Sequence, residues 1–129
     1  MAFVLKQSTS YTWPIPLVIP VDGGRKETHT FDGEFLRLPQ SRINELLTLA
    51  RNVELGKAEP DEMEDVQTAK EMLIGWSGVI DDNGQEIPFS EAALNQLLNI
   101  PGIAGQIVKA FFLSIQAEKE PGKRKNFKP

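Results

Sequence analysis

A run of β-forming residues near the start of the chain, Tyr11 to Val21 ("YTWPIPLVIPV"), contains the prolines Pro14, Pro16 and Pro20. Proline has no backbone N–H group, so a strand that contains it cannot be hydrogen-bonded on both sides along its whole length. The run can therefore form only an edge strand or an interrupted strand. This restricts the possible sheets more strongly than any other feature of the sequence.

A second β-like run, Lys26 to Leu38 ("KETHTFDGEFLRL"), follows the first after Asp22-Gly23-Gly24. Two glycines after an aspartate allow the positive φ angles that a tight hairpin turn requires. We therefore expect residues 11–38 to form an antiparallel hairpin or small sheet. One face should lie against helices, and the other face should be partly exposed.

After Pro39 the apolar residues recur at a spacing of about 3.6 residues, which indicates amphipathic helices. We expect about four helices between residues 40 and 117. Ser41 is the expected N-cap of the first helix, and Gly56 is its expected stop. Its expected apolar face comprises Ile43, Leu46, Leu47, Ala50 and Val53.

The three later helices are predicted from their breakers and caps. The second begins at Pro60, with carboxylates in its first turn, and its apolar stripe extends to Trp76. The third has Ser90 as its N-cap, and the fourth runs from about Ile103 to Ala117.

The predicted fold class is therefore α+β and mainly helical, with a small N-terminal antiparallel β-hairpin or sheet followed by about four α-helices. We expect one domain at residues 1–117, with its β region at 11–38 and its helical region at 40–117. Residues 118–129 ("EKEPGKRKNFKP") are expected to be a flexible basic tail.

The residues offer no support for catalysis. The chain has no cysteine and only one histidine, His29, which is expected to be an ordinary strand residue. The sequence Asp81-Asp82-Asn83-Gly84 lacks the spacing of a calcium loop, because Val79 and Ser90 occupy positions that require acidic ligands. No Gly-x-Ser-x-Gly motif is present. We predict a turn at Gly84, no catalytic residue, no metal or cofactor, and no enzymatic activity.

The charge is unevenly distributed. The chain has a net charge of −4, whereas residues 118–129 carry five basic and two acidic side chains, so the first 117 residues carry −7. An acidic body argues against nucleic-acid binding through phosphates. No apolar run approaches the roughly 18 residues of a membrane span, and the start lacks a signal-peptide pattern, so we expect a cytoplasmic protein without membrane contact.

Several side chains are candidates for protein contacts. Phe111 and Phe112 point about 100 degrees apart on a helix, so one core cannot easily bury both. We expect Phe111, Phe112 and Leu113 to contribute to self-association or partner binding. Trp76, between glycines, is expected to be a core anchor, with an interface role left open.

An acidic cluster lies at the expected start of the second helix and consists of Glu59, Asp61, Glu62, Glu64 and Asp65. Its simplest interpretation is a solvated first helical turn, where carboxylates are favoured by the helix dipole. If the cluster binds a ligand, a positively charged protein segment is the best candidate.

The segment "LIGWSGVIDDNGQEIPFSEAALNQLLNIPGIAGQIVKAFFLSI" resembles the C-terminal half of tail assembly chaperones from long-tailed bacteriophages of the lambdoid kind. The resemblance covers roughly residues 60–126. It rests on a Trp-x-Gly-Val step, an acidic turn with glycine, a Pro-Phe-Ser helix start and an apolar helix after Pro-Gly. The matching positions are Trp76, Gly78, Val79, Asp81, Gly84, Pro88, Phe89, Ser90, Leu94, Leu98 and Pro101.

This resemblance implies a protein that acts in the host cell cytoplasm and is absent from the mature virion. Its partners would be the tape measure protein, which it coats and keeps soluble, and the tail tube protein, which it helps to recruit; a homo-oligomer is expected. The family also implies a longer product made by ribosomal frameshifting. Two alternatives remain: a structural component of the tail or of the head-tail joint, and a nucleic-acid-binding regulator acting through its basic tail.

Overall fold

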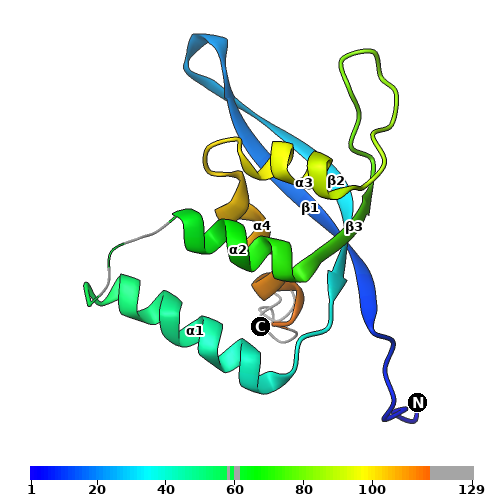
Figure 1. Ribbon diagram of the computed structural model, residues 1–129, viewed down its shortest axis with the longest axis vertical. Coiled ribbons are helices and arrows are strands. Elements are labelled where there is room, and N and C mark those ends of the chain that lie inside the picture. The colour runs from blue at the N-terminus through cyan, green and yellow to red at the C-terminus, as the bar shows by residue number, and fades with distance from the viewer. Residues whose placement is uncertain (58, 60–61, 117–129) are drawn as a thin grey trace, which may run out of the picture.

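The computed structural model describes residues 1–57, 59 and 62–116. These residues form an α+β fold with a three-stranded antiparallel sheet, four helices and 42% helix. Figure 1 shows the long β1–β2 hairpin projecting beyond the helices. In chain order the elements are β1 (Ser10–Val21), the 3-10 turn η1 (Asp22–Gly24), β2 (Arg25–Leu36), α1 (Gln40–Glu54), α2 (Glu62–Met72), β3 (Leu73–Ser77), α3 (Glu91–Leu98) and α4 (Ile103–Ser114).

The hairpin forms as predicted, and β1 is an edge strand. The strand order is β1-β2-β3, and the turn uses positive φ at Gly23 and Gly24. Alternate residues of an antiparallel edge strand direct their backbone groups toward the free edge. Val18 does so, because its N–H and C=O both form hydrogen bonds with the Gln106 side chain. The three prolines lie an even number of residues from Val18, so their backbone nitrogen atoms also face the free edge. Each proline therefore occupies a position where no partner strand needs its missing donor.

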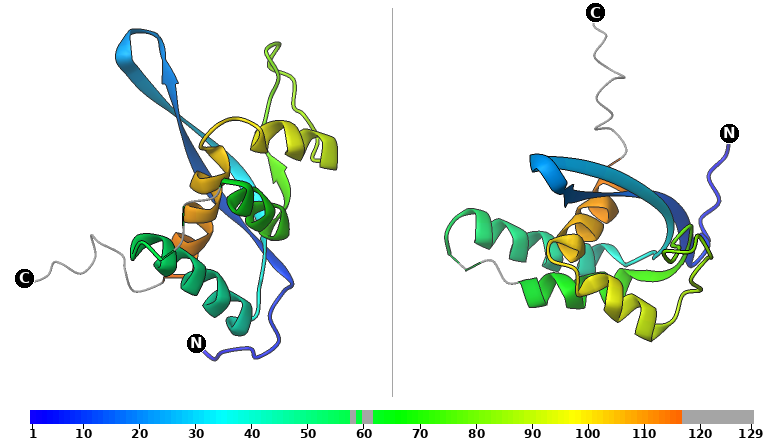
Figure 2. Two further views of the ribbon diagram at one scale, coloured as in Figure 1. Left: turned by 60° about the vertical axis from the view of Figure 1, so that its left-hand side comes forward. Right: turned by 90° about the horizontal axis from the view of Figure 1, so that it is seen from above.

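The sheet buries one face, and the helices lie on that side (Figure 2). The buried side chains alternate along the strands and include Ile15, Leu17, Phe31 and Phe35, whereas Thr28 and Thr30 are exposed on the opposite face. Gly33 lies among the buried residues, and a Cβ atom there would lie 2.4 Å from Ile15 Cδ1 and 2.9 Å from Leu73 Cδ1. Glycine is therefore required where side chains from both neighbouring strands meet over β2.

Helix α4 joins the helices to the sheet. The buried ring of Phe111 meets Phe35 edge to face, with ring centroids 5.3 Å apart. The hydroxyl groups of Tyr11 and Ser114 are hydrogen-bonded at 2.6 Å, which fixes the end of α4 against β1. Helix α2 packs on α4 and leads directly into β3.

The predicted second helix was wrong in its length. It ends at Met72, and Leu73–Ser77 form β3, so Trp76 lies in a strand and the β region extends beyond residues 11–38. The strand pairs with the second edge of β2, and Gly75 lies where a Cβ would be 2.7 Å from Glu34 Oε1. A helical continuation would leave that edge of β2 unpaired, which explains why the tertiary structure overrides the helical pattern. The predicted start at Pro60 lies outside the described residues.

The predicted helix caps differ in outcome. Ser90 is the N-cap of α3, and its Oγ accepts a hydrogen bond from Ala93 N–H at 3.1 Å, as expected. Ser41 is not the N-cap of α1, because Pro39 precedes the helix and its carbonyl accepts from Arg42 and Ile43. The fixed φ of proline holds the chain ready for the first turn without a capping side chain. The predicted tail, residues 118–129, lies outside the described residues.

We predict that Gly33→Ala lowers the free energy of unfolding by about 1–3 kcal/mol, because the added methyl group must displace Ile15 and Leu73 in a packed core. Urea denaturation measures the change. Thr30→Ala, on the exposed face of the same strand, is the control and should stay within about 0.5 kcal/mol of the wild type. Equal losses from both variants would contradict the packing role of Gly33.

Candidate protein-binding site

The Asp81–Gly84 segment is a turn, as predicted. Asp81 Oδ1 accepts hydrogen bonds from Asn83 N–H at 2.9 Å and Gln85 N–H at 3.0 Å, and Gly84 has a φ of 80°. The carboxylate is therefore used to hold the backbone. Within residues 1–57, 59 and 62–116, no group of three or more His, Asp or Glu side chains is placed to hold a metal ion.

Trp76 anchors the loop that contains this turn. Its indole Nε1–H donates to the carbonyl of Ile87 at 2.8 Å. Its ring meets Phe31 and Phe89 edge to face, at centroid distances of 6.2 and 4.9 Å. The half-buried ring thus connects the sheet to the segment before α3, which agrees with the predicted anchoring role.

The three consecutive α4 candidates have three different environments. Phe111 is only 1% exposed and belongs to the core, so it cannot contact a partner directly in this conformation; the expectation for Phe111 is corrected by its contact with Phe35. Phe112 is half-buried, and Leu113 is 54% exposed. Of the three, Phe112 and Leu113 therefore remain as surface candidates.

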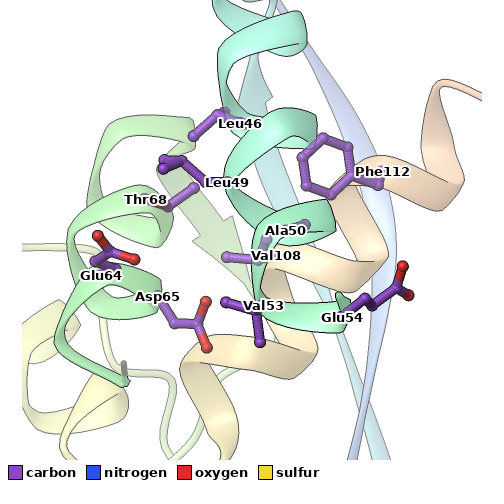
Figure 3. Close-up of a pocket in the computed structure, with 10 residues that line it drawn as sticks. All are labelled: Leu46, Leu49, Ala50, Val53, Glu54, Glu64, Asp65, Thr68, Val108 and Phe112. Atoms are coloured by element: carbon purple, nitrogen blue, oxygen red, sulfur yellow. The ribbon is translucent and has the colours of Figure 1, made fainter. Parts of the chain in front are cut away.

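Phe112 lines a groove between three helices, which we call the acidic groove (Figure 3). Its volume is about 290 Å³. Its side chains come from α1, α2 and α4, and Figure 3 shows the carboxylates of Glu54 and Glu64 at opposite margins of the group. The lining residues are Leu46, Leu49, Ala50, Val53, Glu54, Glu64, Asp65, Thr68, Val108 and Phe112.

The acidic groove exists because α1 is only partly packed. Ile43 and Leu46, in its first half, are its only buried residues. In the second half, Leu47 and Leu49 are 42% and 45% exposed, although the first of these belongs to the predicted apolar face. The apolar pattern of α1 is therefore wider than the surface the rest of the protein covers.

An ion pair holds the packed end of α1. The Arg42 guanidinium donates to Glu71, near the end of α2, through Nε at 3.0 and 3.2 Å and through Nη2 at 2.9 Å. It also donates from Nη1 to Glu45 at 2.8 Å. The hydrogen bonds to Glu71, followed by those to Glu45, raise the pKa of Arg42 above its ordinary value, so it stays charged. The ion pair connects the start of α1 to the end of α2, opposite the acidic groove.

Leu113 lines a second groove, the edge groove, which has a volume of about 610 Å³. It lies between the free edge of β1 and α4, and its lining residues are Trp13, Pro14, Pro16, Val18, Gln106, Lys109, Ala110 and Leu113. Gln106 Oε1 accepts from Val18 N–H at 2.7 Å, and Gln106 Nε2 donates to Val18 C=O at 3.0 Å. Proline and this amide together close the edge to an additional strand from Pro14 to Pro20.

Sequence patterns did not single out Trp13, Gln106 or Leu49 as surface residues. Trp13 lies two residues before the buried Ile15 in the strand alternation, so the pattern places it on the buried face. Leu49 lies beside the predicted apolar stripe of the first helix. Gln106 lies 88 residues from Val18, so no local spacing relates them. Of the features of this region, only the prolines could be read from the sequence, because they mark a strand edge that must not pair with a further strand.

Comparisons with known proteins add no relative: no protein-family model matches the chain, and neither curated proteins nor solved structures gave a significant match. Among the described residues, no single helix is long and apolar enough to cross a membrane, and α3 and α4 meet that criterion only as a pair bent by 103°.

We predict that Glu71→Gln releases α1 without unfolding the protein, because a neutral amide cannot replace the carboxylate that binds Arg42. Amide hydrogen exchange should become faster in α1 and remain unchanged in α4 and in the β1–β2 hairpin. Glu45→Gln is the matched control, since Glu45 is more exposed and pairs with Arg42 within α1, and it should change exchange little. Uniformly faster exchange would show that the ion pair supports the whole domain instead.

Proposed function

We propose that this protein is a tail assembly chaperone of a long-tailed bacteriophage, which binds the tape measure protein, keeps it soluble and helps to recruit tail tube subunits. It would act as a homo-oligomer in the host cytoplasm, without a cofactor or catalysis, and would be absent from the mature virion. The sequence resemblance between residues 60 and 126 supports this proposal.

The structural observation that carries the proposal is that α4 contributes apolar side chains to both the acidic groove and the edge groove. Phe112 contributes to the acidic groove, and Leu113 contributes to the edge groove. Adjacent residues on one helix thus present apolar surface in two directions, which suits a protein that contacts more than one partner. A tape measure protein is a long helical chain that needs such cover before the tail tube surrounds it.

A structural component of the virion is the alternative. The α+β fold with 42% helix favours the chaperone, because tail tube and joining subunits are normally rich in strands. Mass spectrometry of purified phage particles separates the two functions. Stoichiometric amounts of this chain in the particles would contradict the chaperone.

We predict that co-expression with the tape measure protein of the same phage moves that protein from the pellet to the soluble fraction and yields a complex on size-exclusion chromatography. Leu113→Glu should weaken the complex about tenfold or more, because it places a charge in the edge groove. Leu55→Glu is the matched control: Leu55 is 60% exposed and lines neither groove.

The result with the wild-type protein tests the proposed function itself, whereas the result with Leu113→Glu tests only the edge groove. If the tape measure protein remains insoluble and unbound in its presence, the proposed function is wrong. If the wild type binds and Leu113→Glu binds equally well, the function stands and the edge groove is not part of the interface.

A further inference from the structure

The acidic groove combines an apolar floor with acidic side chains of one sign. Val53, Val108 and Phe112 provide apolar surface, and Glu54, Glu64 and Asp65 provide three carboxylates. Among the described residues, no lysine or arginine lines this groove, whereas Lys109 lines the edge groove. An occupant that complements the acidic groove therefore needs apolar side chains flanked by positive charge.

The walls of the acidic groove favour a helix over a strand. All three walls are helices, whose backbone groups are already hydrogen-bonded internally, so the groove offers no edge to an extended peptide. An occupant must therefore satisfy its own backbone, as an α-helix does. Several of the lining side chains, such as Leu49 and Ala50, are exposed, so this groove of about 290 Å³ opens to the surface. The groove has room for side chains projecting from a helix that lies across its mouth.

Helix α1 supplies the surface that such a helix would cover. Leu49 and Ala50 are exposed in its second half, next to half-buried Val53. The Arg42–Glu71 ion pair joins the other end of α1 to α2. A partner helix can therefore bury apolar surface of α1 without breaking the core.

We propose that the acidic groove binds a basic amphipathic helix, whose apolar side chains enter between α1, α2 and α4 and whose lysine or arginine residues face Glu54 and Glu64. This inference rests on the proposed function for the natural partner, which would be helical segments of the tape measure protein with an apolar stripe flanked by basic residues.

The test uses the full chain and designed 21-residue helical peptides with a leucine stripe flanked by either lysine or glutamate. Because the chain has no cysteine, Leu55→Cys, at an exposed position that lines neither groove and directly follows Glu54, gives a single site for a bimane fluorophore, which a tryptophan in the bound peptide quenches. Asp82→Cys, on the turn before α3, carries the same fluorophore as a control. The lysine peptide should quench the label at residue 55 and not the label at residue 82, and the glutamate peptide should quench neither.

Two unlabelled variants test the floor and the rim separately, by isothermal titration calorimetry with the lysine peptide. Ala50→Trp fills the groove and should weaken binding at least tenfold. Glu54→Gln/Glu64→Gln removes two charges and should weaken binding roughly three- to tenfold, with a shallower salt dependence. Asp22→Asn/Asp82→Asn removes two charges elsewhere and should leave the affinity within about twofold of the wild type. Thermal unfolding of each variant confirms that the fold is retained.

Equal weakening by the two charge-neutralising pairs would mean non-specific attraction to an acidic protein and would overturn the proposal. So would concentration-dependent self-association that Ala50→Trp abolishes, because the groove would then be occupied by a second copy. Failure of the proposed function is distinguishable: the tape measure protein would not bind the wild type at all. Binding of the tape measure protein that is unchanged by Ala50→Trp and by Glu54→Gln/Glu64→Gln would overturn only this inference.

Discussion

The meeting of Ile15 and Leu73 over Gly33 is the contact on which the rest of the structure depends. It joins β1 and β3 across β2, at the one position of the buried face where β2 has no side chain. Since α2 leads directly into β3, this contact also places α2. Phe35, two residues beyond Gly33, meets Phe111 and so positions α4 on the same face. The surfaces available to a partner follow from these positions.

The helices are held unequally. Helix α4 has five buried residues among its 12, whereas α1 has two among its 15. The Arg42–Glu71 ion pair holds the start of α1, and the second half leaves apolar side chains exposed beside α2 and α4. In the chaperone proposed above, this arrangement would let the less tightly packed α1 adapt to a partner while the sheet and α4 maintain the fold.

Local chemistry was sufficient to predict much of the fold. Asp22-Gly23-Gly24 predicted the hairpin, the prolines predicted an edge strand, and Ser90 predicted the start of α3, because each acts within a few residues. The strand Leu73–Ser77 was missed, since its residues continue a helical apolar stripe and only the free edge of β2, some 40 residues earlier, selects the extended conformation. For the candidate site, the sequence named Phe111, Phe112 and Leu113 together, and only the fold separates the buried Phe111, which packs on Phe35, from the other two, which reach the surface.

The sequence by itself determined the class of fold, the absence of thiol chemistry, the position of the strand edge that cannot accept a partner, and the surplus of apolar residues on the last helix. Only the tertiary structure decided which of these apolar residues are exposed and which carboxylates lie beside them. Glu54 and Glu64 belong to different helices and become neighbours of Phe112 only when α1, α2 and α4 pack together. The physical reason is that caps, turns and proline act over a few residues, whereas burial and groove formation depend on contacts between segments distant in the chain.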